Sequence, residues 1–348
     1  MPRSPRLTAH HALATTLALL SDRELADLVD SGVPLGAGVG GQVLRVDVGG
    51  RPVFVKRIRV TEAELAPGHA RSTANLFGVP PFCHYGIGDV PSPGATAWRE
   101  LDVHTMTTGW VRSGRLPNFP LTHHWRVLPA SPEPLYEDLA DVDRAVAYWG
   151  GDPALRARIE ALRAAPARLT LFLEYLPATL HDWLSARLRT DDADAACALV
   201  ERDLTALTGF LRERPLTHFD AHFGNILTDG RRLYLTDHGL ALSARFRLTG
   251  RERDFLDRHR DYDRDYTATY LVKWLATDLY GYRGEERTAF VRACAEGLRP
   301  EGIPDAAAAL LVRHARVADV MIDFERRLRG ESRSTPYPAE AVRRAAAA

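Results

Sequence analysis

A glycine-rich segment near the start of the chain leads directly into two strands, and this order constrains the fold more than any other feature. Residues 36–43 match the pattern G-x-G-x-x-G-x-V, with the fixed positions at Gly36, Gly38, Gly41 and Val43. Apolar residues then alternate on each side of Gly49-Gly50, and this period of two predicts an antiparallel hairpin. A dinucleotide-binding fold needs the glycine motif to pass from a strand into a helix, so the sequence argues against that fold.

A lysine stands on the returning strand of the predicted hairpin, thirteen residues after Val43. Lys56 ends the run V-F-V-K, and a lysine in such a run is either an edge residue or a buried cation with an anionic partner. Glycines lack a Cβ atom, so the backbone N–H groups of a glycine loop can approach anionic oxygens. The loop and Lys56 together predict a phosphate-binding site.

The most specific pattern lies in the second half of the chain. Residues 218–225 read H-F-D-A-H-F-G-N, and D-H-G follows at 237–239 after a hairpin predicted around Asp229-Gly230. A carboxylate such as Asp220 can orient an attacking hydroxyl and accept its proton. The side-chain oxygens of Asn225 and Asp237 are the ligands that Mg²⁺ prefers, and the ion would bridge nucleotide phosphates. The sequence therefore predicts phosphoryl transfer.

In this order of motifs, over about residues 30–280, the chain resembles the protein kinase-like superfamily. The resemblance implies an α+β, bilobal protein kinase-like fold, with a small antiparallel β-sheet in the N-lobe and a mainly α-helical C-lobe. It implies ATP and Mg²⁺ as cofactors. The implied roles are nucleotide binding by Gly36, Gly38, Gly41, Val43 and Lys56, adenine binding by the backbone near Glu174 and Leu176, catalysis by Asp220 with His218 and His222 in the same loop, and metal binding by Asn225 and Asp237.

The resemblance also implies a helical glutamate that pairs with Lys56. We favour Glu100, because it lies in the first clear helix before the next strand. Glu62 and Glu64 lie closer to the lysine in sequence and remain alternatives.

Several positions depart from the protein kinase pattern. Phe219 stands where protein kinases commonly have arginine, His222 where Ser/Thr kinases commonly have lysine, and His238 where phenylalanine is usual, and no A-P-E triplet follows. H-x-D-x-H-x-x-N is closer to aminoglycoside- and choline-kinase-like phosphotransferases, whereas the glycine loop, V-F-V-K and L-E-Y-L at 173–176 are closer to protein kinases. We expect Ser or Thr of a protein or peptide as the acceptor. The alternatives are a small-molecule O-phosphotransferase, a nucleotide-binding pseudokinase and an enzyme that transfers a nucleotidyl group.

The expected organisation is a helical extension at 1–30, an N-lobe at 31–176 with a helical insertion at 129–168, and a C-lobe at 177–340. Because 45 Lys and Arg balance 45 Asp and Glu, we expect neither a nucleic-acid nor a membrane partner. Three separated cysteines predict buried thiols in a reducing cytoplasm. We interpret the insertion as extra packing and the mixed charges of residues 257–270 as a solvated helix face.

Overall fold

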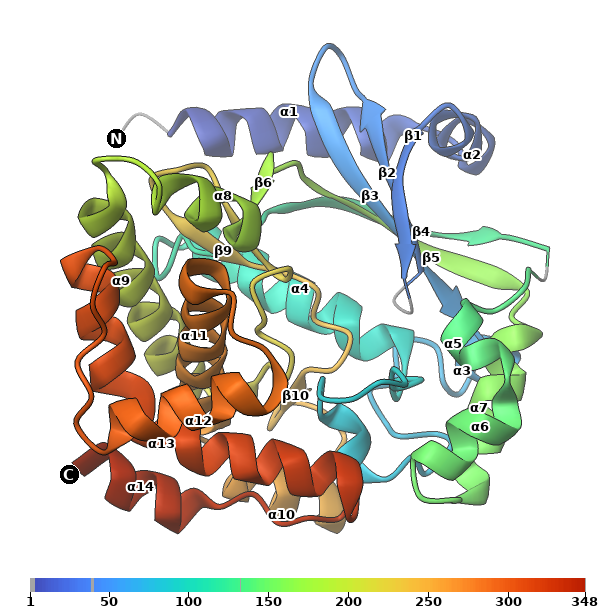
Figure 1. Cartoon of the computed structure of the whole chain (residues 1–348). Helices are drawn as coiled ribbons and strands as arrows, with labels where there is room; N and C mark the ends of the chain where they lie inside the picture. Colours follow the sequence, from blue (N-terminus) through green and yellow to red (C-terminus); the bar gives the residue numbers. More distant parts are fainter. Residues whose placement is uncertain (1–3, 39–40, 132, 348) are drawn as a thin grey trace. The chain divides into compact units, whose positions relative to one another are not determined.

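The computed structural model describes residues 4–38, 41–131 and 133–347 (Figure 1). The chain divides into two compact units, which are described separately. Unit 1 comprises Met1–Leu176, Thr236–Ala241 and Arg245–Gly250, and unit 2 comprises Pro177–Leu235, Leu242–Ala244 and Arg251–Ala348. The fold is mixed α/β, with one small antiparallel five-stranded sheet and many helices.

Unit 1 contains the five-stranded sheet, in the order β1-β2-β3-β5-β4. Each pair of neighbouring strands is antiparallel, and the strands are β1 (Val33–Gly38), β2 (Gly41–Asp47), β3 (Pro52–Val60), β4 (Thr122–Pro129) and β5 (Ala167–Glu174). The hairpin predicted around Gly49-Gly50 is confirmed, and it joins β2 to β3. Both glycines have positive φ, 61° and 76°, as a tight turn between twisted strands requires.

Helices cover both faces of this sheet. α1 (Pro5–Leu19) and α2 (Asp22–Asp30) contribute Leu17 and Leu25 to a core that includes Phe172 of β5. α4 (Ala97–Arg112) packs on a second core with Leu171 and Leu173, the neighbours of Phe172. This alternation follows from the period of two along a strand, and it explains why β5 is buried on both sides.

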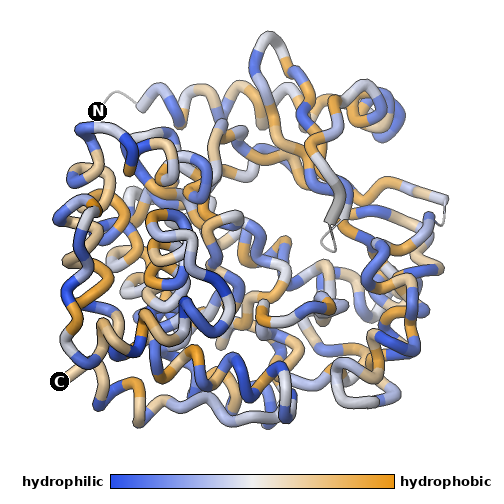
Figure 2. The backbone as a smooth tube through the Cα atoms, in the orientation of Figure 1, coloured by the Kyte–Doolittle hydropathy of each residue, from blue (hydrophilic) through white to orange (hydrophobic). Residues whose placement is uncertain are grey.

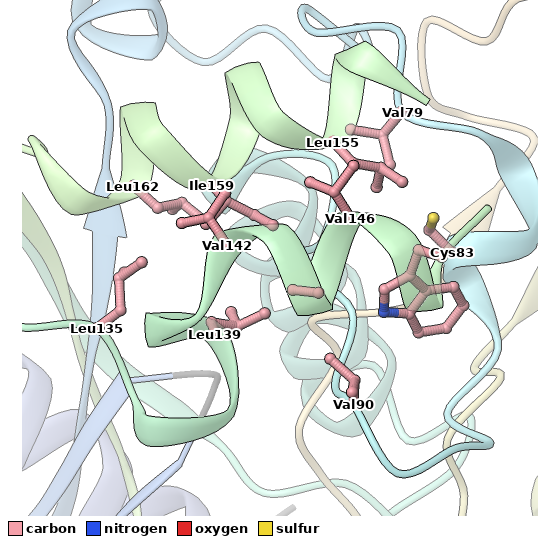
Figure 3. Packing of buried hydrophobic residues seen from close by; sticks show 12 residues of the cluster. Val79, Cys83, Val90, Leu135, Leu139, Val142, Val146, Leu155, Ile159 and Leu162 are labelled. Carbon is pink, nitrogen blue, oxygen red and sulfur yellow. The ribbon is translucent and has the colours of Figure 1, made fainter. Parts of the chain in front are cut away.

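The insertion forms a small core of its own. It consists of α5 (Glu137–Ala140), α6 (Val142–Tyr148) and α7 (Pro153–Arg163). α5 and α6 are separated at Asp141, whose ψ of 88° is not helical and whose carboxylate caps α6. Buried apolar side chains from α6 and α7 meet Val79, Cys83 and Val90, as Figure 3 shows.

Two shorter helices, α3 (Glu62–Leu65) and the 3₁₀ helix η1 (Pro81–His84), precede α4. Trp149 of the insertion is buried and stacks on Phe82 of η1, with ring centroids 6.4 Å apart. The Tyr148 hydroxyl accepts a hydrogen bond from the Asp89 backbone at 2.7 Å. The insertion is thus fastened to the segment between α3 and α4.

Unit 2 is mainly helical. Its helices are α8 (Leu180–Arg187), α9 (Ala193–Arg212), α10 (Gly250–Arg258), α11 (Tyr262–Tyr280), α12 (Gly284–Ala295), α13 (Asp305–Gly330) and α14 (Ala339–Ala347), with the first residue of α10 counted in unit 1. Hydrophobic and hydrophilic residues alternate along α13, the pattern of a helix with one buried face (Figure 2). No helix in the described ranges is long and apolar enough to cross a membrane.

Short strands complete unit 2. β6 (Ala178–Thr179), β8 (Ile226–Thr228) and β9 (Leu233–Leu235) form one sheet, and β7 (Leu216–Thr217) pairs with β10 (Leu242–Ser243). The hairpin predicted around Asp229-Gly230 is confirmed as the β8–β9 turn. The three cysteines of the chain are free and buried.

Candidate functional site

The Lys56 ammonium is bound by two carboxylates of unit 1. Lys56 Nζ lies 2.7 Å from Glu100 Oε1 of α4 and 2.6 Å from Asp237 Oδ1. The Lys56 and Glu100 side chains are 5% and 4% exposed, whereas Asp237 is 41% exposed. Burial alone would lower the pKa of Lys56, but the two carboxylates outweigh it and hold the pKa above its ordinary value. The ammonium is therefore a fixed positive charge, with one buried and one accessible partner.

Strand register explains the position of Lys56. It lies opposite Val43 of β2 and Leu171 of β5, and Val55 before it packs into the core below α1 and α2. Because successive side chains alternate between faces, Lys56 points to the face that α4 covers. Glu100 lies in the first turn of α4, which begins after Thr96 caps it.

The other two candidate glutamates have different surroundings. Glu62 is exposed on α3. Glu64 is fully buried and pairs with Arg158 of α7 at 3.0 Å, while its other oxygen accepts from the Ala97 backbone at 2.8 Å. Among the described contacts, the glutamate that pairs with Lys56 is Glu100, and Glu64 instead joins α3, α4 and α7.

Two histidines support this ion pair. Nε2 of His104, one turn after Glu100, lies 3.8 Å from Glu100 Oε1. The His104 ring meets the ring of His238 edge to face, with centroids 4.6 Å apart. Both rings are buried, so this aromatic pair joins α4, beside Glu100, to the residue that follows Asp237.

The glycines of the motif differ in how much space a Cβ atom would have at each position. At Gly41, φ is 116° and a Cβ would lie 1.8 Å from the Arg57 carbonyl oxygen, so only glycine fits beside β3. At Gly36, φ is 149° and no described atom lies within 4 Å of a Cβ. Gly36 pairs with Val43, and Gly38 pairs with Gly41. Residues 39–40 of the glycine motif lie outside the described ranges.

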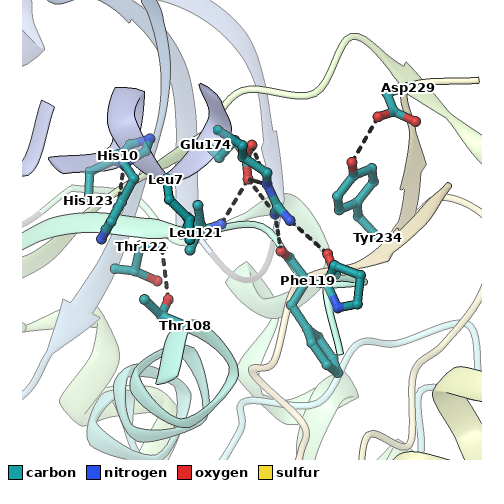
Figure 4. A network of polar contacts seen from close by, with 12 residues as sticks. Leu7, His10, Thr108, Phe119, Leu121, Thr122, His123, Glu174, Asp229 and Tyr234 are labelled. Carbon is teal, nitrogen blue, oxygen red and sulfur yellow. Dashed lines mark hydrogen bonds and ion pairs between the residues drawn. The ribbon is translucent and has the colours of Figure 1, made fainter. Parts of the chain in front are cut away.

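Glu174 ends β5, and Leu176 is the last residue of the first segment of unit 1. The Glu174 backbone N–H donates to the Leu121 carbonyl at 2.8 Å, and the Glu174 carboxylate accepts from the Leu121 N–H at 3.0 Å. Figure 4 shows the contact between the Glu174 carboxylate and Leu121. The carboxylate also pairs with Arg6 of α1, a residue that the sequence analysis did not single out.

The predicted catalytic loop is in unit 2. The Asn225 amide nitrogen donates to the Asp220 carbonyl at 2.9 Å and to Asp220 Oδ2 at 3.1 Å. His218 Nδ1 accepts from the Asp220 backbone at 3.3 Å. His222 Nδ1 accepts from the Gly224 backbone at 3.0 Å, so in the neutral ring Nε2 carries the hydrogen. That nitrogen lies 3.9 Å from Asp220 Oδ1.

The Asp263 side chain binds the backbone of this loop, a role that the sequence analysis did not identify. Its two oxygens accept from the backbone N–H groups of His218 at 2.7 Å and Phe219 at 2.9 Å. Phe219 has a φ of 67°, which is rare for a non-glycine residue, and its buried ring packs on Phe255 and Tyr262. Burial raises the pKa of Asp263 to about 6, although the two hydrogen bonds act in the opposite direction.

The solvated face expected for residues 257–270 is wrong in its second half. Asp263, Asp265, Tyr262 and Tyr266 are all buried, because the start of α11 packs against the loop and the C-terminal segment. Asp265 accepts from the hydroxyl of Tyr337 and pairs with Arg264 at 2.8 Å. Because acidic and basic residues alternate in this segment, the sequence did not reveal that these tyrosines and aspartates face the interior.

Two tyrosines of α11 complete the surroundings of the loop. Burial raises the pKa values of both Tyr266 and Tyr270, and the nearby Asp220 carboxylate acts in the same direction. The Tyr270 ring lies 6.0 Å from the His222 ring and 5.0 Å from the Phe223 ring. Tyr266 and Tyr270 are four residues apart, so their side chains lie on one face of α11.

The predicted site residues thus form two groups. Lys56, Glu100 and Asp237 belong to unit 1, and Asp220, His218, His222 and Asn225 belong to unit 2. Within the described ranges, no group of three or more His, Cys, Asp or Glu side chains is arranged to hold a metal ion by itself.

No family model matches the chain. A search of curated proteins likewise finds no significant match. Function is therefore inferred from the residues themselves.

Proposed function

We propose that this chain is an ATP-dependent phosphotransferase with a protein kinase-like fold, which moves the γ-phosphoryl group of Mg-ATP to a hydroxyl. Units 1 and 2 would be its two lobes. The observation that carries the proposal is the buried ion pair of Lys56 and Glu100, with Asp237 on the same ammonium. A buried lysine with a permanent charge is suited to bind phosphate oxygens.

Unit 2 supplies residues for the acceptor side of the reaction. Asp220 would orient the acceptor hydroxyl and take its proton as the oxygen–phosphorus bond forms and the bond to the leaving diphosphate breaks. The Asn225 amide fixes the Asp220 carboxylate, and Asp263 fixes the backbone before it. The aspartate is thereby positioned before an acceptor binds, which is how such sites lower the barrier.

The side-chain oxygens available fit a magnesium ion. Mg²⁺ prefers carboxylate and amide oxygens and retains several waters, so two protein ligands suffice when phosphates supply others. Asp237 is the accessible carboxylate of unit 1. Asn225 uses its amide nitrogen for Asp220, which leaves its carbonyl oxygen to bind the ion. The ion would neutralise charge on the nucleotide phosphates.

For the acceptor we propose Ser or Thr of a protein or peptide, on the similarity of the glycine loop and the L-E-Y-L strand end to protein kinases. One observation favours the small-molecule alternative. α10 begins at Gly250, only thirteen residues after Asp237, which leaves a short segment for docking a peptide. The partly buried Tyr270 near Asp220 would suit a compact acceptor as well as a peptide.

Transfer of label from γ-labelled ATP into a host-cell extract tests the proposal. We expect label in the protein fraction with the wild-type enzyme and none with Asp220→Asn. Label in a metabolite would assign a small-molecule acceptor. A parallel reaction with α-labelled ATP identifies nucleotidyl transfer. Equal labelling by the wild-type and Asp220→Asn proteins would contradict the proposal, and a wild-type protein that binds Mg-ATP without transferring label would indicate a pseudokinase.

Replacement of the glutamate beside Lys56 gives a sharper test of unit 1. We expect Glu100→Gln to reduce kcat/KM for ATP about tenfold, because a neutral amide replaces one of the two carboxylates that bind the ammonium. Initial rates at varied ATP concentration measure the effect. Glu62→Gln, at an exposed position of α3, is the matched control and should leave kcat/KM for ATP unchanged. An equal loss of kcat/KM in both variants would contradict the assignment of Glu100 as the partner of Lys56.

A further inference from the structure

A salt bridge joins the first turn of α1 to the end of β5, across 168 residues of sequence. Arg6 Nε lies 2.8 Å from Glu174 Oε1, and Arg6 Nη2 lies 2.7 Å from Glu174 Oε2. The same guanidinium donates to the carbonyl oxygens of Pro117 at 2.8 Å and Phe119 at 2.5 Å. Each Arg6 nitrogen therefore has an acceptor, and the guanidinium plane is fixed on four oxygens.

The arrangement also fixes Glu174 itself. Its carboxylate accepts from Arg6 and from the Leu121 N–H, and its own N–H donates to the Leu121 carbonyl. Both charged side chains are 19% exposed, so they are largely shielded from solvent. Without the guanidinium, the largely buried Glu174 carboxylate would lie near the carbonyl oxygens of Pro117 and Phe119 with no cation between them. A buried charge without a partner is unfavourable.

The rest of α1 keeps Arg6 in this position. Leu13 and Leu17 are buried in the core with Val53 and Phe172. His10 Nδ1 lies 3.0 Å from His123 Nδ1 of β4. Burial lowers the pKa values of these histidines to about 4 and about 3, so the pair is neutral near pH 7 and one ring donates to the other.

We propose that Arg6 is a positioning residue for nucleotide binding, and that α1 thereby sets the geometry of the adenine-binding backbone at residues 174–176. This inference rests on the proposed function. Arg6 does not touch the nucleotide in this scheme; it binds the Glu174 carboxylate and so fixes the strand end whose backbone would bind the base. An arginine is required because only its planar fork reaches a carboxylate and two carbonyls at once.

Binding of Mg-ATP to the full-length protein, measured by calorimetry with Asp220→Asn as the non-hydrolysing background, tests the inference. We expect Arg6→Ala to weaken binding about tenfold, because several charge-assisted hydrogen bonds are lost. In the otherwise wild-type enzyme, KM for ATP should rise by a similar factor while kcat changes less than about twofold. Arg6→Lys should not restore affinity.

The matched control is Arg126→Ala. Arg126 of β4 pairs with Asp22 of α2 at 2.5 Å, so it also joins the helical extension to the sheet, but at another point. We expect wild-type affinity for this variant. A double variant, Arg6→Ala with Glu174→Gln, should bind no more weakly than Arg6→Ala alone if the arginine acts through the glutamate.

The outcomes separate the two ideas. Wild-type affinity in Arg6→Ala would overturn the inference and leave the proposed function intact. Equal weakening in Arg6→Ala and Arg126→Ala, in proportion to their loss of melting temperature, would also overturn it, because the role would be structural. No Mg-ATP binding by the parent protein, with Lys56→Met indistinguishable from it, would overturn both.

Discussion

Asp220→Asn is expected to lower turnover about a thousandfold and to leave the dissociation constant of Mg-ATP within about twofold of wild type. The substitution keeps the size of the side chain but removes the group that accepts a proton, and general-base catalysis contributes about 10²–10⁴-fold. The Asn225 amide and the His218 ring still hold the loop, since their bonds to the Asp220 backbone persist. Steady-state rates and calorimetric titration measure the two quantities.

Asp192→Asn is the matched control for this experiment. Asp192 is an exposed aspartate of the same unit and pairs with Arg187 on the surface, so it should leave both quantities unchanged. Turnover by Asp220→Asn at the wild-type rate would refute the role of this loop in chemistry. If Asp220→Asn instead weakened Mg-ATP binding in parallel with turnover, Asp220 would contribute to ground-state binding of the nucleotide.

Asp263→Ala is expected to lower the free energy of unfolding of unit 2 by about 2–5 kcal/mol and to reduce turnover more than tenfold at temperatures where the protein stays folded. Two buried N–H groups lose their acceptor, and each orphaned donor costs about 1–3 kcal/mol. Phe219 also loses what holds its left-handed backbone. Denaturant unfolding followed by tryptophan fluorescence, with parallel rates, measures both effects.

Asp257→Ala is the control for Asp263. Asp257 is 61% exposed on α10 and pairs with Arg260 three residues later on the surface, so the change should stay within about 0.5 kcal/mol. Asp263→Asn keeps the volume and one oxygen, so its loss of stability should be intermediate. An unchanged denaturation midpoint and unchanged turnover in Asp263→Ala would show that the proposed catalytic loop is held by other contacts.

Local patterns in the sequence predicted the parts of the fold that depend on near neighbours. The β2–β3 hairpin follows from two glycines between alternating apolar residues, and a local capping box at Ser21 and Glu24 starts α2. These two elements need no distant contact to be recognised. The sequence did not predict the break at Asp141, because residues on both sides of it have helical patterning.

Tertiary contacts decided what local patterns left open. Glu64 and Glu100 are both helical glutamates after β3, and only the position of Arg158, which lies 94 residues beyond Glu64, distinguishes a structural carboxylate from the lysine partner. Asp263 was assigned to a solvated face because its neighbours alternate in charge. The spacing of Tyr262 and Tyr266, one helical turn apart, was the available signal that this part of α11 faces inward.

The discontinuous course of unit 1 has a consequence for the order in which the protein matures on the ribosome. Lys56 and Glu100 are synthesised early, but Asp237 follows Lys56 by 181 residues. The late segments also supply Leu240, whose carbonyl binds His84, and Arg247, whose N–H binds Thr73. A nascent chain that ends at Leu176 therefore lacks part of its own unit, and Lys56 gains its second carboxylate only after the first segment of unit 2, Pro177–Leu235, has been made.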